Sequence, residues 1–243
     1  MRHFPARRLV CLTEETVETL YLLGEQNRIV GVSGYAVRPP QVRREKPRVS
    51  AFTSADIPKI EALKPDLVLA FSDIQASIAA DLARAGLAVH IFNQRDLAGI
   101  FAMIRTLGAL IGCTEKANAL AHSFEERIES VRRETRKLAR RPRVYFEEWD
   151  EPMITGLCWV SELIEIAGGD DIFPEKRGEP AAKHRIVSAD DVARRSPEII
   201  LASWCGKKVR PEKIRARDGW QNIPAVVENK IYEIKSPLIL QPG

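Results

Sequence analysis

The stretch Lys64-Pro-Asp-Leu-Val-Leu-Ala-Phe-Ser-Asp73 decides the fold, because its pattern comes back later in the chain. Residues 196–204, Ser-Pro-Glu-Ile-Ile-Leu-Ala-Ser-Trp, repeat a proline, an acid, three aliphatic residues and an alanine, followed by aromatic and hydroxyl residues. Each apolar run is typical of a strand covered on both faces of a parallel sheet. Each also follows a helical pattern that begins Ser-Ala-Asp, with Ser54 and Ser188 as expected N-caps. We therefore expect two α/β lobes that are built alike.

Strand and helix patterns alternate on both sides of the middle of the chain. The expected strands are 8–12, 28–33, 67–71, 88–92, 143–147, 199–202 and 230–234. The expected helices are 13–23, 54–63, 74–85, 97–111, 161–167 and 189–195. This alternation is typical of α/β folds.

One further helical pattern, 114–139, contains neither Gly nor Pro. At 1.5 Å per residue it would be roughly 39 Å long, too long for a crossover within one small sheet. We interpret it as a helix that connects two lobes. The expected organisation is an N-terminal lobe at 1–113, a connecting helix at 114–141 and a C-terminal lobe at 142–243.

Composition excludes several classes of protein. The 37 basic residues are set against 33 acidic ones, and the basic residues between 127 and 143 are interleaved with glutamates. This pattern favours an ion-paired helical face over a nucleic-acid-binding one. No run approaches the roughly 18 apolar residues of a membrane-spanning helix. The first ten residues lack the apolar region of a secretory signal, so a signal precedes Met1 or the protein stays in the cytoplasm.

Motifs for catalysis are absent from the sequence. There is no GxSxG, P-loop, HExxH or GxGxxG, and the four Cys and four His show no metal-ligand spacing, so we expect neither an enzyme nor a metal site. Carboxylates cluster between Glu147 and Glu151 after an expected strand. A solvated loop or a polar contact with a ligand is favoured there over acid–base chemistry.

Aromatic residues fall in loops or at the ends of the expected elements. They are Tyr35, Phe52, Phe71, Trp149, Trp159 and Trp204. Ligands of open α/β sheets bind beyond the carboxyl ends of the strands, which places Phe71, Ser72 and Trp204 at the sheet rims. Aromatics on opposed rims would suit a large, flat, mostly apolar ligand in a cleft between the lobes.

Four segments carry a family resemblance: Val30–Pro40, Leu63–Val68, Gly168–Phe173 and Val187–Val192. They resemble the cobalamin and iron-siderophore substrate-binding proteins of ABC importers, and most closely the cobalamin-binding members. The resemblance implies the class III architecture, in which one rigid helix joins two similar lobes around a ligand cleft. It also implies a periplasmic or other extracytoplasmic location, no intrinsic cofactor and a monomer.

The resemblance also implies roles for particular residues. It implies a hydrophobic sandwich for a corrin-like ring, with walls at Tyr35, Phe52, Phe71, Trp149 and Trp204. Expected polar ligand contacts are Glu148, Arg38 and Ser72.

The family docks on its ABC permease through one acidic residue per lobe. Asp190 fits the second of these positions, whereas Pro58 stands at the first and leaves Glu61 as a displaced substitute. The family also ends with a helix after its last strand, and we expect that helix to be missing from 236–243.

Three functions stay open at this point. The first is capture of cobalamin or another corrinoid for an ABC importer. The second is capture of a ferric siderophore or haem, whose anionic groups could meet Arg38, Lys207 and Lys208. The third is a cytoplasmic corrinoid-handling protein or enzyme on the same scaffold, suggested by the missing signal and the carboxylates at 147–151.

Overall fold

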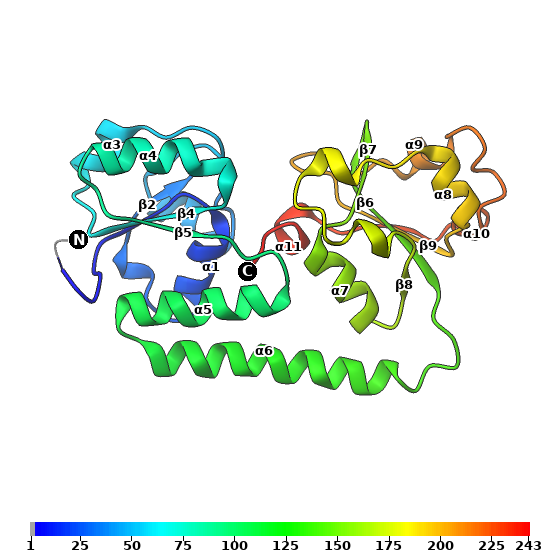
Figure 1. Cartoon of the computed structure of the whole chain (residues 1–243), viewed down its shortest axis with the longest axis horizontal. Helices are drawn as coiled ribbons and strands as arrows, with labels where there is room; N and C mark the ends of the chain where they lie inside the picture. Colours follow the sequence, from blue (N-terminus) through cyan, green and yellow to red (C-terminus); the bar gives the residue numbers. More distant parts are fainter. Residues whose placement is uncertain (1–2) are drawn as a thin grey trace. The chain divides into compact units, whose positions relative to one another are not determined.

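The structure, a computed structural model, describes residues 3–243 and divides the chain into two units. Unit 1 comprises Met1–Phe124 with Gly243, and unit 2 comprises Glu125–Pro242. Each unit contains a five-stranded sheet with helices on both faces (Figure 1). The boundary between the units falls within helix α6 (Thr114–Thr135). The predicted α/β class and its division into two strand-and-helix units are confirmed.

The sheet of unit 1 is parallel throughout, in the order β3-β2-β1-β4-β5. Its strands are β1 (Leu9–Cys11), β2 (Ile29–Ser33), β3 (Arg48–Ser50), β4 (Leu67–Phe71) and β5 (Val89–Phe92). Strand β4 has the predicted bounds and is buried along its whole length. Strand β5 was expected to be buried, but it lies at the edge of the sheet and Ile91 is 43% exposed.

Helices cover both faces of this sheet. They are α1 (Glu14–Leu22), α2 (Val42–Glu45), α3 (Ile57–Ala62), α4 (Ala76–Arg84) and α5 (Leu97–Ile111), with 3-10 turns η1 (Gln26–Arg28) and η2 (Asp73–Gln75). Figure 1 shows α3 and α4 over one face and α1 and α5 over the other. Side chains alternate across a strand, so Val10 and Val68 meet Ile60, Ile78 and Leu82 in the core on the α3–α4 side.

One predicted helix start in unit 1 is wrong, and another is confirmed. Helix α3 begins at Ile57 rather than near Ser54, and its N-cap is Asp56, whose side chain accepts a hydrogen bond from Lys59 N (3.0 Å). The reason is that the preceding residues pair with β3, through an antiparallel bridge between Ser50 and Ala55. Thr13 does stand at the N-cap of α1, but its hydroxyl makes no capping hydrogen bond.

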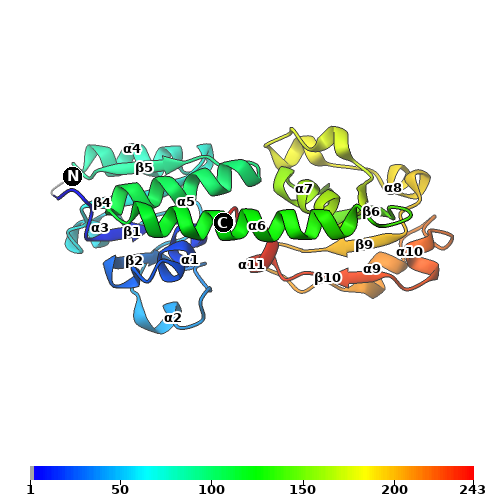
Figure 2. The ribbon, with the colours of Figure 1, turned by 90° about the horizontal axis from the view of Figure 1, so that it is seen from below.

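Helix α5 and the part of α6 that belongs to unit 1 lie side by side (Figure 2). A Cβ atom added at Gly108 of α5 would lie 2.1 Å from the Cβ atom of Ala117 of α6, so the glycine permits the close approach. Helix α6 has 22 residues and is therefore roughly 33 Å long. It ends at Thr135, four residues before the predicted end, and the Thr135 hydroxyl donates a hydrogen bond to Ile166 O (2.9 Å).

The sheet of unit 2 has the order β10-β9-β6-β7, with β8 paired to the first residues of β6. Its strands are β6 (Arg143–Asp150), β7 (Met153–Thr155), β8 (Asp170–Asp171), β9 (Ile199–Ala202) and β10 (Ile231–Glu233). Strand β6 was expected to end at Glu147 in a loop. It continues to Asp150 because β7 pairs with it in an antiparallel hairpin, so the carboxylates from Glu147 to Asp150 lie on a strand.

Helices also cover both faces of the second sheet. They are α7 (Cys158–Ile166), α8 (Ala189–Arg195), α9 (Pro211–Arg215), α10 (Pro224–Val227) and α11 (Ser236–Ile239), with 3-10 turns η3 (Pro174–Lys176) and η4 (Ala182–Arg185). Figure 1 shows α7 on the side of the sheet opposite α8 and α9. The predicted N-cap of α8 is confirmed, since Ser188 Oγ accepts a hydrogen bond from Asp191 N (3.1 Å). Helix α11 follows β10, where no helix was expected.

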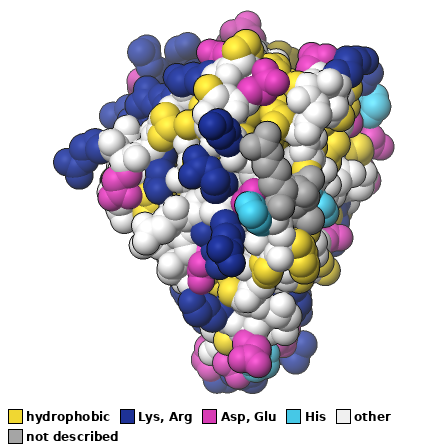
Figure 3. Space-filling view, turned by 90° about the vertical axis from the view of Figure 1, so that its left-hand side faces the viewer, with side chains coloured by type: hydrophobic (Ala, Val, Ile, Leu, Met, Phe, Trp, Pro, Cys, Tyr) yellow, Lys and Arg dark blue, Asp and Glu magenta, His cyan; other side chains and the backbone are white. Residues whose placement is uncertain are grey.

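Charged side chains are distributed in mixed patterns. On the second half of α6 and just beyond it, ion pairs join Arg132 to Glu129 (2.6 Å) and Lys137 to Glu134 (2.9 Å), as predicted for an ion-paired face. On the face that Figure 3 presents, Lys and Arg side chains are separated by acidic, apolar and uncharged ones. Within residues 3–243, no helix has both the length and the apolar character that a membrane span requires.

Candidate ligand-binding site

The predicted ligand-binding aromatics lie at the carboxyl ends of strands in both units. Tyr35 and Phe52 each follow a strand by two residues, after β2 and β3, and Phe71 ends β4. In unit 2, Trp149 belongs to the last residues of β6 and Trp204 follows β9 by two residues. The predicted positions at the sheet rims are therefore confirmed, whereas contact with a ligand stays a prediction.

The rim of unit 1 exposes apolar side chains. Tyr35 is 55% exposed and Phe52 is half-buried. Ile74, in the turn after β4, is 47% exposed and was not among the predicted residues. The sequence feature that could have identified Ile74 is its position three residues beyond a buried strand. These three side chains give the rim of unit 1 an apolar character.

Phe71 and Ser72 lie beneath the surface of the same rim. Phe71 is 6% exposed and Ser72 is 1% exposed. The Arg95 guanidinium lies over the Phe71 ring, with 5.4 Å between its carbon and the ring centroid. Ser72 Oγ accepts a hydrogen bond from Ile74 N (3.3 Å) and so caps the turn η2. The structure thus gives both residues partners within the protein.

Gln75 holds the strand ends of this rim together and was not predicted. Its Nε2 donates hydrogen bonds to Phe52 O (2.9 Å) and Leu12 O (3.3 Å). Its Oε1 accepts one from Phe71 N (3.0 Å). The side chain is fully buried, and these three hydrogen bonds satisfy its polar atoms inside the protein. Gln75 therefore fixes the loop that carries Phe52.

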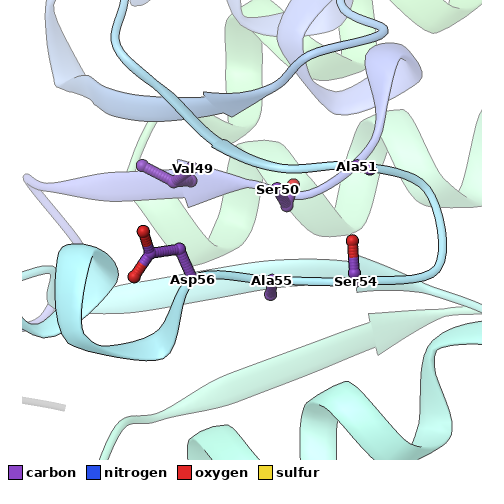
Figure 4. Close-up of a pocket in the computed structure, with 6 residues that line it drawn as sticks. All are labelled: Val49, Ser50, Ala51, Ser54, Ala55 and Asp56. Carbon is purple, nitrogen blue, oxygen red and sulfur yellow. The ribbon is translucent and has the colours of Figure 1, made fainter.

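A hollow of about 350 Å³ lies beside the edge strand β3. Its lining residues are Val49, Ser50, Ala51, Ser54, Ala55 and Asp56 (Figure 4). The lining offers two hydroxyls and one carboxylate but no aromatic ring, and Asp56 already accepts a hydrogen bond as the N-cap of α3. This hollow therefore does not suit a flat apolar ligand.

The predicted contact Arg38 is engaged with a carboxylate. Its Nη2 lies 2.5 Å from Glu18 Oε1, and its side chain keeps about a third of its surface exposed. Glu18 belongs to α1, so the ion pair ties the loop after β2 to that helix. An anionic ligand would have to compete with Glu18 for this guanidinium.

A second hollow, of about 260 Å³, lies at the carboxyl end of β9 in unit 2. Its lining residues are Asp150, Trp204, Lys207, Lys208, Arg210 and Lys213. Sequence reasoning named Trp204, Lys207 and Lys208 but missed Arg210 and Lys213. The sequence feature that could have identified those two residues is the density of basic residues after β9. Four basic side chains and one carboxylate thus surround this hollow.

Trp204 is fixed in place by a buried ion pair. It is 2% exposed, and its Nε1 donates a hydrogen bond to Glu147 Oε1 (2.9 Å). Glu147 is fully buried and also accepts a hydrogen bond from Arg217 Nη2 (3.0 Å). A buried carboxylate needs such partners, because an unpaired charge in the interior is strongly destabilising. The indole is a firm wall of the second hollow with little free surface.

An ammonium group covers the ring of Trp149. Lys207 Nζ lies 4.0 Å from the Trp149 ring centroid and 5.0 Å from that of Trp204, and it forms an ion pair with Asp150. Burial raises the pKa of Asp150, but the Lys207 hydrogen bond and charge outweigh it, so the pKa is lowered overall. The predicted aromatic wall of unit 2 therefore presents a cation at its surface.

Glu148 points to a different partner from its neighbour Glu147. Its carboxylate forms an ion pair with Arg185, whose side chain is 2% exposed and also donates to Thr155 O. The pairing of β6 with β7 is irregular between Glu147 and Trp149, and the two adjacent glutamates meet different arginines. The predicted ligand contact of Glu148 is thus occupied by a protein group in this structure.

The two predicted docking residues are exposed. Glu61 lies on α3 and Asp190 in the first turn of α8. Their contact with a permease stays a prediction. Among residues 3–243, no three His, Cys, Asp or Glu side chains are grouped as a metal site would require.

Comparison with known proteins decides the family. Residues 9–238 match the family described as periplasmic binding protein. The chain belongs to the periplasmic binding protein family. The resemblance of its motifs to substrate-binding proteins of ABC importers is thereby confirmed.

Two curated relatives represent the family. A vitamin B12-binding protein of Vibrio cholerae is 29% identical over 204 residues, which are 82% of this chain and 71% of the relative. An uncharacterised ABC transporter substrate-binding lipoprotein of Bacillus subtilis is 24% identical over 246 residues, covering 98% of this chain and 75% of the relative. Both alignments span most of this chain.

Solved structures of the family share the fold. The crystal structure of the periplasmic vitamin B12-binding protein of Vibrio cholerae matches with a TM-score of 0.77 and 25% identity, over 98% of this chain and 91% of that one. A periplasmic haem-binding protein from Roseiflexus matches with a TM-score of 0.83 and 20% identity, over 98% and 93%. The class III fold that the resemblance implied is confirmed, whereas the ligand cleft between the lobes stays a prediction.

Proposed function

We propose that this protein is the substrate-binding component of an ABC importer and that its ligand is cobalamin or a related corrinoid. The observation that carries the proposal is the similarity to the Vibrio cholerae vitamin B12-binding protein, at 29% identity over 82% of the chain. The crystal structure of that species' protein, which matches over 98% of the chain, supports the same ligand.

The rim of unit 1 supports a ligand with a large apolar surface. Tyr35, Phe52 and Ile74 present two aromatic rings and an aliphatic side chain at the carboxyl ends of three strands. Aromatic side chains contribute a large apolar contact area at low conformational cost, and a corrin offers a broad ring system to match it.

We propose binding without catalysis. Glu147 and Glu148 belong to the carboxylate cluster weighed for acid–base chemistry, and each is held in an ion pair with an arginine. The bound metal would be part of the ligand, since the chelate brings its own. A turnover assay with corrinoid substrates tests this statement, and any catalytic conversion above a protein-free control would overturn it.

Calorimetric titration of the purified protein with cyanocobalamin tests the proposed ligand. We expect a dissociation constant in the micromolar range or below and a melting temperature that rises with ligand concentration, because the ligand binds the folded state. Replacing Tyr35 and Phe52 together by Ala should weaken binding roughly tenfold or more, since two aromatic contacts are removed. Val227→Ala, at a side chain 67% exposed in unit 2, is the control. Failure to bind cobalamin, ferric siderophores or haem would refute a carrier function.

A ferric siderophore or haem is the second candidate ligand. Two observations favour it: the basic residues around the unit 2 hollow and the fold shared with the Roseiflexus haem-binding protein. Competition between cyanocobalamin, haem and a ferric hydroxamate at equal concentrations distinguishes the candidates. Displacement of bound cobalamin by an equimolar amount of either competitor would favour this second ligand class.

The proposed partner is an ABC permease, with Glu61 and Asp190 as docking residues. Both are exposed and acidic, and they occupy helices of different units. The family membership and the Bacillus subtilis relative support this partner. We also propose that the protein acts outside the cytoplasm, as a monomer. Recovery of the native protein only from the cytoplasmic fraction would instead support a corrinoid-handling factor inside the cell.

A further inference from the structure

We propose that the unit 2 hollow binds an anionic oxygen group of the ligand, a phosphate or a carboxylate, and thereby selects ligands that carry one. The inference rests on the proposed function, because it assigns a ligand group to one rim of the same carrier. It concerns side chains that follow β9 and lie within unit 2 alone.

The hollow has an excess of positive charge. Lys207, Lys208, Arg210 and Lys213 line it together with a single carboxylate, that of Asp150. Lys207 and Asp150 form an ion pair and offset each other. Within the part of the chain that the structure describes, the other three basic side chains carry no ion pair. An anion placed there would meet three cations without displacing a protein carboxylate.

Two carboxylates near this rim are already engaged. Glu147 accepts hydrogen bonds from Arg217 and Trp204. Glu233, at the end of β10, accepts a hydrogen bond from Val209 N (3.1 Å) through its Oε1. These bonds hold the acidic groups to structural partners, so they compete little for the cations of the hollow.

The segment that carries the cations is anchored at both ends. Trp204 is buried before it, Val209 is 2% exposed in its middle, and Ile214 of α9 is fully buried after it. The anchors place four basic residues around one hollow rather than scattering them along a free loop. Such preorganisation lowers the entropy lost when a charge-assisted hydrogen bond to a ligand forms.

The covered Trp149 ring points to the same conclusion. Lys207 lies over the aromatic faces of Trp149 and Trp204, so the rim of unit 2 presents ammonium and guanidinium groups where a second aromatic wall was predicted. The rim of unit 1, with Tyr35 and Phe52, remains apolar. The two rims therefore differ in chemistry, and the anionic group is assigned to the rim of unit 2 alone.

Paired ligands that differ by the anionic group provide the test. Cyanocobalamin contains a phosphodiester in its nucleotide loop, whereas dicyanocobinamide lacks that loop. Haem carries two propionates, whereas its dimethyl ester carries none. The triple variant Lys208→Gln, Arg210→Gln, Lys213→Gln removes the free cations, and Arg133→Gln, Arg136→Gln, Lys183→Gln removes equal charge outside the hollow. All six side chains are exposed, so both variants should fold, which their melting temperatures check.

We expect the wild-type protein to bind cyanocobalamin roughly tenfold or more tightly than dicyanocobinamide, as charge-assisted hydrogen bonds imply. The hollow variant should lose most of this preference and its dependence on salt, while the control variant keeps both. Equal preference in the wild-type and hollow variants would overturn the inference and leave the proposed corrinoid function intact.

Haem and its dimethyl ester test whether the hollow recognises a carboxylate. If corrinoids do not bind, the proposed ligand fails, but a preference for haem over its ester that the hollow variant loses would still support the inference. If wild-type protein shows no preference within either ligand pair, the hollow has no role in recognising anions.

Discussion

The buried carboxyl group of Glu15 makes the stability of unit 1 depend on pH, and burial also raises the pKa of its neighbour Glu14. Glu15 is 1% exposed in the first turn of α1. Burial raises its pKa from 4.5 to about 7, although a hydrogen bond from Thr13 Oγ1 (2.6 Å) opposes the rise. Between these two values the folded chain retains a proton that the unfolded chain has released. The free energy of unfolding therefore falls as pH rises from about 4.5 to about 7 and then levels off.

The substitution Glu15→Gln should remove the contribution of Glu15 to this dependence, because the amide keeps an acceptor for Thr13 and carries no charge. We expect the variant to gain on the order of 3 kcal/mol over the wild-type protein at pH 8, and little near pH 4.5. Urea denaturation at both pH values measures the difference. A gain of the same size at both would show that the charge of Glu15 is not responsible.

The pair of helices α5 and α6 depends on small residues at its contact. Ala117 and Ala121 of α6 are fully buried, and Gly108 of α5 leaves no room for a methyl group against Ala117. Gly108→Ala should lower the free energy of unfolding by about 1 to 3 kcal/mol through overpacking, even though Ala has the higher helix propensity. Gly178→Ala is the control, because its added methyl group meets no atom within 4 Å. Equal melting temperatures for the two variants would contradict the packing argument.

The length and regularity of an element decide how well sequence patterns predict it. Helices α5 and α8 and strands β4 and β9 have the predicted bounds, because each has a clear apolar pattern with a cap or proline at its boundary. Strands β3 and β7 have three residues each and were missed. Strands this short contain too few residues for a period to show, and the equally short β1 and β10 were predicted only as parts of longer expected strands, 8–12 and 230–234.

For the whole protein, the proposed function requires delivery as well as binding. Reversing the charges of the docking residues with Glu61→Arg and Asp190→Arg should abolish cobalamin-stimulated ATP hydrolysis by the reconstituted permease. Binding of cobalamin in solution should stay unchanged, because neither side chain lines the hollow beside β3 or the hollow after β9. Glu115→Arg and Glu228→Arg, exposed acids of unit 1 and unit 2 that line neither hollow, serve as the matched control. Undiminished stimulation by the Glu61 and Asp190 variant would exclude these residues as docking contacts.

Local patterns along the chain are enough to predict the α/β class, the two lobes and the aromatic positions at the strand ends. Apolar runs, caps and prolines act within a few residues, so they can be read directly from the sequence. Tertiary structure alone decides how those positions are used. Trp204 meets Glu147, Glu148 meets Arg185 and Lys207 covers Trp149, and each contact joins residues 37 to 58 positions apart. Such partners depend on which strands become neighbours, and no local period records that choice.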